Sequence, residues 1–236
     1  MGQEVLALLD LKGSERVLDV GCGDGKITAE IAARVPRGSV VGVDPSRDMI
    51  SFAQSHYGRA TSHNLRFQVA DARSLPFQRE FDLVVSFNAL HWIPEQNAAL
   101  SSIRSALISG GKAQLRLVPA GARQSVENVV EETRQTSRWN TYFQDFHDPY
   151  LHLKPEQYAA MAERNGFRVL DVSMKDQTWD FGSPAAFSAF CAVGCVAWTT
   201  RLPAAERVDF INEVLDRYRA VAADGSEEGH TFKFYQ

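Results

Sequence analysis

A glycine-rich turn directly after a short apolar run is the feature of this sequence best suited to ligand binding. Residues 17–25 read Val-Leu-Asp-Val-Gly-Cys-Gly-Asp-Gly, and a helical pattern begins at Lys26. Glycines let the backbone pass close to a ligand, and the start of a helix presents unpaired N–H groups and a positive dipole end. The glycine spacing is G-x-G-x-G rather than G-x-G-x-x-G, which disfavours a turn that binds a dinucleotide diphosphate.

One acid further along the chain narrows the ligand class. Asp44 ends the second predicted strand, about 20 residues after Gly23, where an acid can accept hydrogen bonds from both hydroxyls of a ribose. The turn and this acid together predict a ligand that contains adenosine. The alternative is that Asp44 only caps the helix that follows it.

A parallel sheet has to position these residues, because the first half of the chain alternates short β-rich runs with helical patterns. The predicted strands cover residues 16–20, 39–43, 64–69, 81–86 and 112–118. The predicted helices cover residues 26–35, run from 46 toward 58, and run from 94 to a stop at 110–111. The strands are apolar enough for a sheet that is covered on both faces.

Two longer segments interrupt this alternation in the second half of the chain. The first follows the fifth strand and is too long for a plain connection. After it we predict a helix at 155–165, a sixth strand at 167–174, helices at about 185–199 and 203–220, and a last strand at 230–235. We therefore expect one domain over residues 1–236, with segments 119–154 and 180–221 as insertions.

Over residues 17–118 the sequence resembles the class I S-adenosylmethionine-dependent methyltransferases, through the glycine turn at 21–25. The run at 86–93, Ser-Phe-Asn-Ala-Leu-His-Trp-Ile, is similar to the trans-aconitate and juvenile-hormone-acid methyltransferases. The resemblance implies an α/β fold: a Rossmann-like, seven-stranded methyltransferase sheet with helices on both faces and helical insertions after strands 5 and 6. It also implies a cofactor-binding half at 1–118, S-adenosyl-L-methionine as cofactor and a small-molecule substrate.

The same resemblance assigns the cofactor-binding residues to the ends of the first four strands. The residues that would hold the methionine portion are Asp19, Gly21, Cys22, Gly23 and Asn88. Asp44 would bind the ribose, and the residues that would border the adenine are Pro45, Ser46, Met49, Asp71 and Ala72. Two alternatives remain open here, because Met49 has the helical spacing of a core residue and Asp71 could be an ordinary turn residue.

The chemistry implied is an in-line displacement, which needs a positioned nucleophile and a dry pocket. A carboxylate acceptor is ionised at neutral pH and needs no general base. A phenol or an amine would need one, and the nearest candidate for this catalytic role is His91, followed by Trp92 as a substrate residue. A histidine beside a tryptophan could equally well only orient the loop.

The insertions should form a lid over the acceptor, because they follow strands whose carboxyl ends face the cofactor. Their aromatic residues suit an apolar or planar acceptor, and the substrate candidates are Trp139, Tyr142, Phe143 and Phe146. The alternative is that these aromatics form the insertions' own core. Polar candidates for acceptor recognition are Arg123, His147 and His152.

The net charge, the length of the apolar runs and the number of cysteines argue against several other classes of protein. A net charge of −4 over 236 residues gives no basic footprint for nucleic acid. No apolar run approaches the length of a membrane span, so we expect a cytoplasmic protein without a membrane partner. Three cysteines complete no metal site. We expect O-methylation of a carboxylic acid; the alternatives are a phenol, amine or carbon acceptor, a non-catalytic cofactor-binding module, or a nicotinamide oxidoreductase. The sequence does not indicate an oligomeric state.

Overall fold

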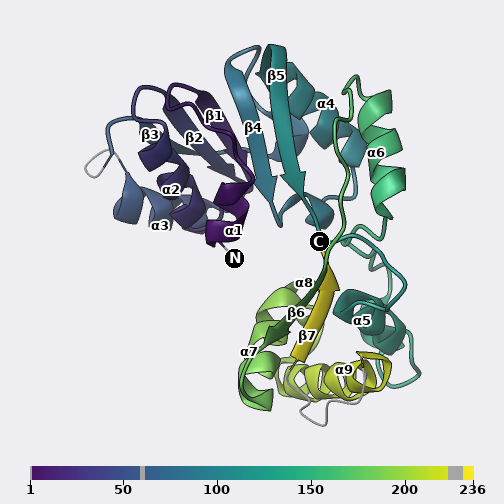
Figure 1. Cartoon of the computed structure of the whole chain (residues 1–236). Coiled ribbons are helices and arrows are strands. Elements are labelled where there is room, and N and C mark those ends of the chain that lie inside the picture. The colour runs from purple at the N-terminus through teal and green to yellow at the C-terminus, as the bar shows by residue number, and fades with distance from the viewer. Residues whose placement is uncertain (1, 59–61, 223–230) are drawn as a thin grey trace. The chain divides into compact units, whose positions relative to one another are not determined.

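The chain divides into two compact units (Figure 1). This computed structural model describes residues 2–58, 62–222 and 231–236. Unit 1 comprises residues 1–117 and 156–172, and unit 2 comprises residues 118–155 and 173–236. Within the described ranges, no helix is long and apolar enough to cross a membrane.

Unit 1 is built on a parallel five-stranded sheet with the strand order β3-β2-β1-β4-β5. The strands are β1 (Arg16–Val20), β2 (Ser39–Asp44), β3 (Leu65–Val69), β4 (Phe81–Phe87) and β5 (Leu107–Arg116). The chain winds outward from β1 through β2 and β3, and then returns to β4 on the other side of β1. The winding therefore reverses between β1 and β4, and open α/β sheets bind ligands at the carboxyl ends of the strands at such a point.

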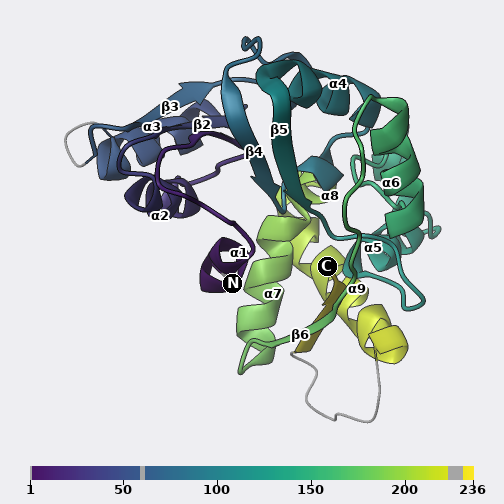
Figure 2. The ribbon, with the colours of Figure 1, turned by 45° about the horizontal axis from the view of Figure 1, so that its top comes forward.

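Both faces of this sheet are buried, which explains why its inner strands are almost continuously apolar. Val17 packs in one core cluster with Ile31 and Ile50, whereas its neighbour Leu18 packs in the other cluster with Ile103. The helices of unit 1 are α1 (Gly2–Ala7), α2 (Lys26–Arg34), α3 (Arg47–Tyr57), α4 (Gln96–Ala106) and α6 (Pro155–Arg164), with single 3-10 turns η1 (Ala72–Ser74) and η2 (Leu90–Trp92). Figure 2 shows α2 and α3 on one side of the sheet and α4 on the other.

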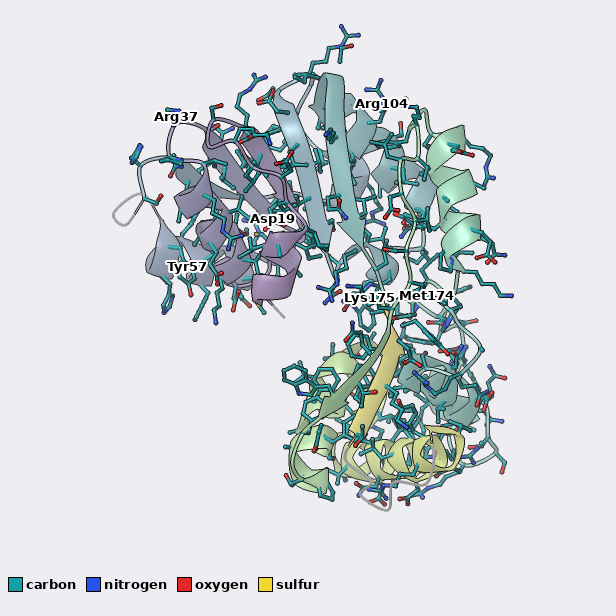
Figure 3. The ribbon with its side chains drawn as sticks, in the orientation of Figure 1. Asp19, Arg37, Tyr57, Arg104, Met174 and Lys175 are labelled. Carbon is teal, nitrogen blue, oxygen red and sulfur yellow. The ribbon has the colours of Figure 1, made fainter. Side chains whose placement is uncertain are left out.

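The residues after α6 remain attached to unit 1 through α4. The Arg104 side chain donates to the carbonyl of Gly166 at 3.3 Å, and the Asn165 amide donates to Asn97 Oδ1 at 2.9 Å (Figure 3 labels Arg104). Phe167 packs against the core cluster on the α4 face. These contacts hold α6 beside α4 within unit 1.

Unit 2 contains both segments that the sequence marks as insertions, 119–154 and 180–221. Its elements are α5 (Val126–Arg134), η3 (Asn140–Phe143), β6 (Asp176–Asp180), α7 (Pro184–Gly194), α8 (Val196–Thr199), η4 (Ala204–Glu206), α9 (Arg207–Ala222) and β7 (Thr231–Tyr235). The two strands pair antiparallel, with Thr178 opposite Lys233. The large side chains of this core include Trp198, Phe210 and Tyr218, which are at most 1% exposed.

The predicted seven-stranded sheet is not what the described residues form. The main sheet has five strands, and β6 and β7 make a separate two-stranded sheet. The predicted sixth strand at 167–174 is not a strand, because no neighbour covers it: Leu170, Val172 and Met174 are 66%, 50% and 46% exposed. A strand forms instead two residues later, at β6, where β7 supplies the hydrogen-bonding partner.

Candidate functional site

The glycine turn after β1 is shaped by left-handed backbone conformations. Gly21, Gly23 and Gly25 have φ angles of 77°, 53° and 81°. The N–H of Gly21 donates to the carbonyl of Val43 at 2.8 Å, which ties the turn to β2. A Cβ added to Gly21 would lie 2.2 Å from the Cβ of Ala89, whereas a Cβ added to Gly23 would meet nothing within 4 Å. The turn is therefore packed on the loop after β4 at Gly21 and open at Gly23.

Asp44 braces this turn from the end of β2. Its Oδ2 accepts from the N–H of Gly23 at 3.1 Å, and its Oδ1 accepts from the N–H of Ser46 at 2.9 Å. The cap of α3 is Ser46, whose hydroxyl accepts from the N–H of Met49 at 3.3 Å. A carboxylate offers about four lone-pair positions, so each oxygen of Asp44 keeps one for a further donor.

Asp19 lies inside unit 1, on β1 (Figure 3). It is 2% exposed, and its Oδ2 accepts from the Thr28 hydroxyl at 2.7 Å. Burial raises the pKa of Asp19 to about 6, and the nearby charge of Asp44 acts in the same direction. Among the described residues Asp19 forms no ion pair. A buried acid without a cation costs stability, and acids with a pKa shifted in this way are frequent at functional sites.

The candidate adenine side is more exposed. Met49 is 46% exposed, so it is not a core residue, and Pro45 is exposed as well. Asp71 does act as a turn residue, because its carboxylate accepts from the N–H of Arg73 at 2.8 Å and caps η1. It also pairs with the Arg73 guanidinium at 2.6 Å, which lowers the pKa of Asp71. Ala72 is buried directly behind this turn.

The loop after β4 carries the remaining candidates of unit 1. Asn88 has a φ of 57°, a conformation that asparagine tolerates better than most residues, and its N–H donates to the carbonyl of Arg116 at 2.9 Å. His91 is 4% exposed, and burial lowers its pKa to about 4. The ring of Trp92 is half-buried, with its centroid 5.6 Å from that of His91.

Comparison with known proteins identifies the domain that carries these residues. Residues 17–111 match a family model described as a methyltransferase domain. The juvenile hormone acid O-methyltransferase of Drosophila melanogaster is 28% identical over 234 residues, which cover 94% of this chain and 77% of that protein. The trans-aconitate 2-methyltransferase of Deinococcus radiodurans is 28% identical over 226 residues, which cover 92% of this chain and 82% of that protein.

A solved structure supports the same assignment at the level of the fold. Phosphoethanolamine N-methyltransferase 2 of Haemonchus contortus, in complex with S-adenosyl-L-methionine, aligns with a TM-score of 0.61 and 17% identity over 99% of this chain and 50% of that one. Residues 17–111 form a methyltransferase domain, and these matches together support a class I S-adenosylmethionine-dependent methyltransferase. The predicted family, enzyme class and cofactor are confirmed.

The residues of this methyltransferase fit its cofactor. Gly23 has open space where a side chain would stand, which leaves room for a ligand beside the backbone. Asp44 keeps acceptor capacity on both oxygens, as a ribose diol requires. Asp19 is a buried acid with no ion-pair partner in the described part of the chain, and the methionine portion of S-adenosylmethionine carries an ammonium group. Cys22 is buried, and burial raises the pKa of its thiol, so the thiol is protonated at neutral pH.

The four aromatic substrate candidates of the methyltransferase occupy different environments within unit 2. Trp139 is fully buried, donates its indole N–H to Glu213 at 2.8 Å, and meets Phe210 edge-to-face at 5.2 Å. Phe143 is 4% exposed and also lies against Phe210. The structure thus gives these two a packing role, as the alternative interpretation expected, and a substrate contact from either stays a prediction.

The other two aromatic candidates are more accessible. Tyr142 is 36% exposed. Phe146 is half-buried, with the guanidinium carbons of Arg134 and Arg201 at 5.2 and 5.4 Å from its ring centroid. Guanidinium groups this close to a phenyl ring stabilise it by cation–π attraction, so Phe146 is held in place by its own unit.

Two of the three polar candidates of unit 2, Arg123 and His152, have partners within that unit. Arg123 forms a two-pronged ion pair with Asp176, at 2.6 and 3.1 Å, and stacks over Tyr235. His152 donates from Nε2 to Asp148 at 2.7 Å, which raises the pKa of His152. His147 is exposed. In the described part of the chain, no group of three or more His, Cys, Asp or Glu side chains is arranged to hold a metal ion.

Two residues near the site were missed at the sequence level. Thr28, on α2, is fully buried, and its hydroxyl donates a hydrogen bond to the Asp19 carboxylate. Gln96, at the start of α4, is 2% exposed and hydrogen-bonds the loop after β4. Thr28 lies within one turn of the glycine motif, so its position facing the strand could have been read from helical spacing; Gln96 gave no such signal.

Proposed function

We propose that this methyltransferase transfers the methyl group of S-adenosylmethionine to a carboxylate oxygen of a small organic acid. Two relatives that align with more than nine-tenths of the chain are named as enzymes that methylate acids, juvenile hormone acid and trans-aconitate. Identity near 28% supports the reaction class and leaves the acid itself open.

The observation that carries the choice of acceptor is the state of His91. Its pKa of about 4 means that the ring is neutral at pH 7 and is a weak base. A phenol or an ammonium acceptor would have to lose a proton, and His91 is poorly suited to remove it. A carboxylate is already ionised at pH 7, so it needs no base. We propose that His91 contributes to catalysis as a neutral group that orients the acceptor, together with Trp92.

The cofactor-binding roles are part of the same proposal. Asp19 would bind the ammonium group of the methionine portion, Asp44 would bind the ribose diol, and the turn around Gly21 and Gly23 would lie along the methionine portion. When bound, S-adenosylmethionine supplies a methyl group that its sulfonium already activates. The residues proposed to complete this site are Cys22, Pro45, Ser46, Met49, Asp71, Ala72 and Asn88.

What the protein adds is position and exclusion of water. Holding two reactants in line lowers a barrier by up to about 7–11 kcal/mol in favourable cases. The loop of Asn88 packs on the glycine turn through Ala89 and Gly21, so the two proposed binding segments share one rigid contact. We propose that residues 119–154 and 180–221 supply acceptor contacts, with Tyr142 and Phe146 the accessible aromatic candidates.

The test is methyl transfer from labelled S-adenosylmethionine to a panel that contains juvenile hormone acid, trans-aconitate, aromatic acids, phenols and amines. Methyl esters are cleaved by mild alkali, whereas methyl ethers and methylamines survive it. We expect label that is released as methanol after alkali treatment. Label that is found only in alkali-stable products would assign the acceptor to another class.

A further inference from the structure

We propose that Gln96 is a positioning residue for methyl transfer, because its side-chain amide fixes the turn that carries His91 and Trp92. This inference rests on the role proposed above for that turn. Gln96 is the first residue of α4, is 2% exposed, and has a side chain that reaches back to the preceding segment.

Both N–H groups of the Gln96 amide are used on one turn. Nε2 donates to the carbonyl of Leu90 and to the carbonyl of Ile93, each at 2.5 Å. The Leu90 carbonyl also accepts the N–H of Ile93 at 3.1 Å. The amide therefore joins the first and last carbonyls of the segment 90–93, and a change in the length of that segment would break at least one of these bonds.

The oxygen of the same amide indicates that the donor nitrogen, and not the acceptor oxygen, is the part of the Gln96 side chain that is used. Gln96 Oε1 is buried and has no hydrogen-bond donor within reach among the described residues. An unsatisfied buried acceptor costs free energy, so glutamine is a poor choice for this position unless its two donors are needed. A glutamate or a methionine of the same length would supply neither donor.

The turn held in this way is linked to the glycine turn through Ala89. The N–H of Trp92 donates to the carbonyl of Ala89 at 3.1 Å, and Ala89 is the residue that packs on Gly21. A shift of the segment 90–93 would therefore move His91 and Trp92 relative to the glycine turn. Misplacement of about 1 Å can cost roughly 100-fold in rate even when the chemistry itself is untouched.

If Gln96 only stabilised the helix α4, the expected result for Gln96→Glu would be the opposite of the one expected from a positioning role. Position 96 is in the first turn of α4, where a negative charge is favourable. If Gln96 served only the helix, Gln96→Glu would be neutral or stabilising. If it positions the turn, Gln96→Glu removes both donors and places carboxylate oxygens against two carbonyls.

The matched control is Gln54, on α3. Its Nε2 also donates to a backbone carbonyl, that of Phe67 at 3.1 Å, but this bond ties α3 to β3 and touches no proposed catalytic segment. Gln96→Glu, Gln96→Met and Gln54→Met should be compared by amide hydrogen exchange of the peptide that spans 88–95, by calorimetric titration with S-adenosylhomocysteine, and by turnover with the best acid from the panel.

We expect faster exchange at Trp92 and Ile93 and a kcat lower by about 10- to 100-fold in both Gln96 variants, with a smaller loss of S-adenosylhomocysteine affinity. Gln54→Met should keep wild-type exchange in 88–95 and wild-type kcat. Wild-type exchange in Gln96→Glu, or equal losses in the Gln96 and Gln54 variants, would overturn the proposal. Exchange and binding need no acceptor, so they test it even if no acid in the panel is methylated.

Discussion

The ends of β1 and β2 differ in what they leave open to a ligand. At the end of β1, Asp19 is buried and Gly21 packs against Ala89. At the end of β2, Asp44 is half-buried, and Met49 beyond it is 46% exposed. The end of β1 is therefore closely packed and desolvated, and burial of its acid lowers the stability of the fold. The end of β2 is open to solvent, and its acid lowers the stability little. Substitutions at the end of β1 should mainly change the free energy of unfolding, and substitutions at the end of β2 should mainly change the affinity for the cofactor.

The largest expected effect on cofactor binding is at Asp44. Each hydrogen bond to a charged group contributes roughly 1.5–3 kcal/mol, so loss of two ribose contacts in Asp44→Ala should weaken S-adenosylmethionine binding at least about 100-fold. Asp48→Ala is the control, because Asp48 is an exposed acid in the first turn of the same helix. Calorimetry measures both variants. If Asp44→Ala bound S-adenosylmethionine within about threefold of wild type, the proposal that the end of β2 determines cofactor affinity would be wrong.

The second effect is on folding, at Gly21. Gly21→Ala places a methyl group 2.2 Å from Ala89 and forces a left-handed conformation on alanine, which together should cost about 2–5 kcal/mol. Gly23→Ala has the same backbone strain without the clash, so it should cost only about 1–2 kcal/mol. Urea denaturation compares the two. Equal losses would show that the packing against Ala89 relaxes freely.

The third effect concerns the charge of Asp19. Its pKa in the folded protein is about 6, above its ordinary value of 3.8, so the folded state binds the proton more tightly than the unfolded state. The contribution of the Asp19 proton to the free energy of unfolding is fully present below pH 3.8 and is lost as the pH rises through 6. Asp19→Asn lacks this loss, so its free energy of unfolding relative to wild type should increase by about 2 kcal/mol from pH 4 to pH 7.

Denaturation of wild type and Asp19→Asn at several pH values measures this difference, and the difference between the two proteins cancels the titration of all other groups. Asp19→Asn should also bind S-adenosylmethionine more weakly, because it lacks the negative charge proposed to meet the ammonium group. A constant stability difference between pH 4 and pH 7 would mean that Asp19 is not desolvated as the structure indicates.

The smallest effect is at Met49. If Met49 borders the adenine, Met49→Ala should lower cofactor affinity by about 1 kcal/mol, or roughly fivefold, because alanine is too short to cover the apolar face of the ring. Stability should change little, because the side chain is already 46% exposed. Met174→Ala is a matched control, because Met174 is also 46% exposed and lies in the other unit. The same fall in affinity in both variants would argue against an adenine contact at Met49.

The parts that were predictable from the sequence depend on local patterns. The glycine turn, Asp44 and the first four strands follow one another in short apolar runs and turns, and each is found within one or two residues of its predicted place. The start of α5 is set by a local signal of the same kind, a capping box between Ser125 and Asn128.

The parts that were not predictable depend on contacts between residues far apart in the chain. Trp139 is buried because Phe210 and Glu213 cover it, some 70 residues later. Residues 167–174 are rich in apolar residues but pair with no strand among the described residues, whereas the polar segment at β6 becomes a strand because β7 pairs with it. Gln96 looks like an ordinary exposed glutamine at a helix start, and only the fold of the preceding loop buries it.

The closeness of Gly21 to Ala89 has an evolutionary consequence. The two positions share room for a single methyl group, so Gly21 can gain a side chain only if Ala89 loses its own. Ala89→Gly should therefore suppress most of the packing defect of Gly21→Ala and leave only the backbone strain. In a selection for cofactor binding, substitutions at 21 and 89 should be recovered as a pair and rarely one by one.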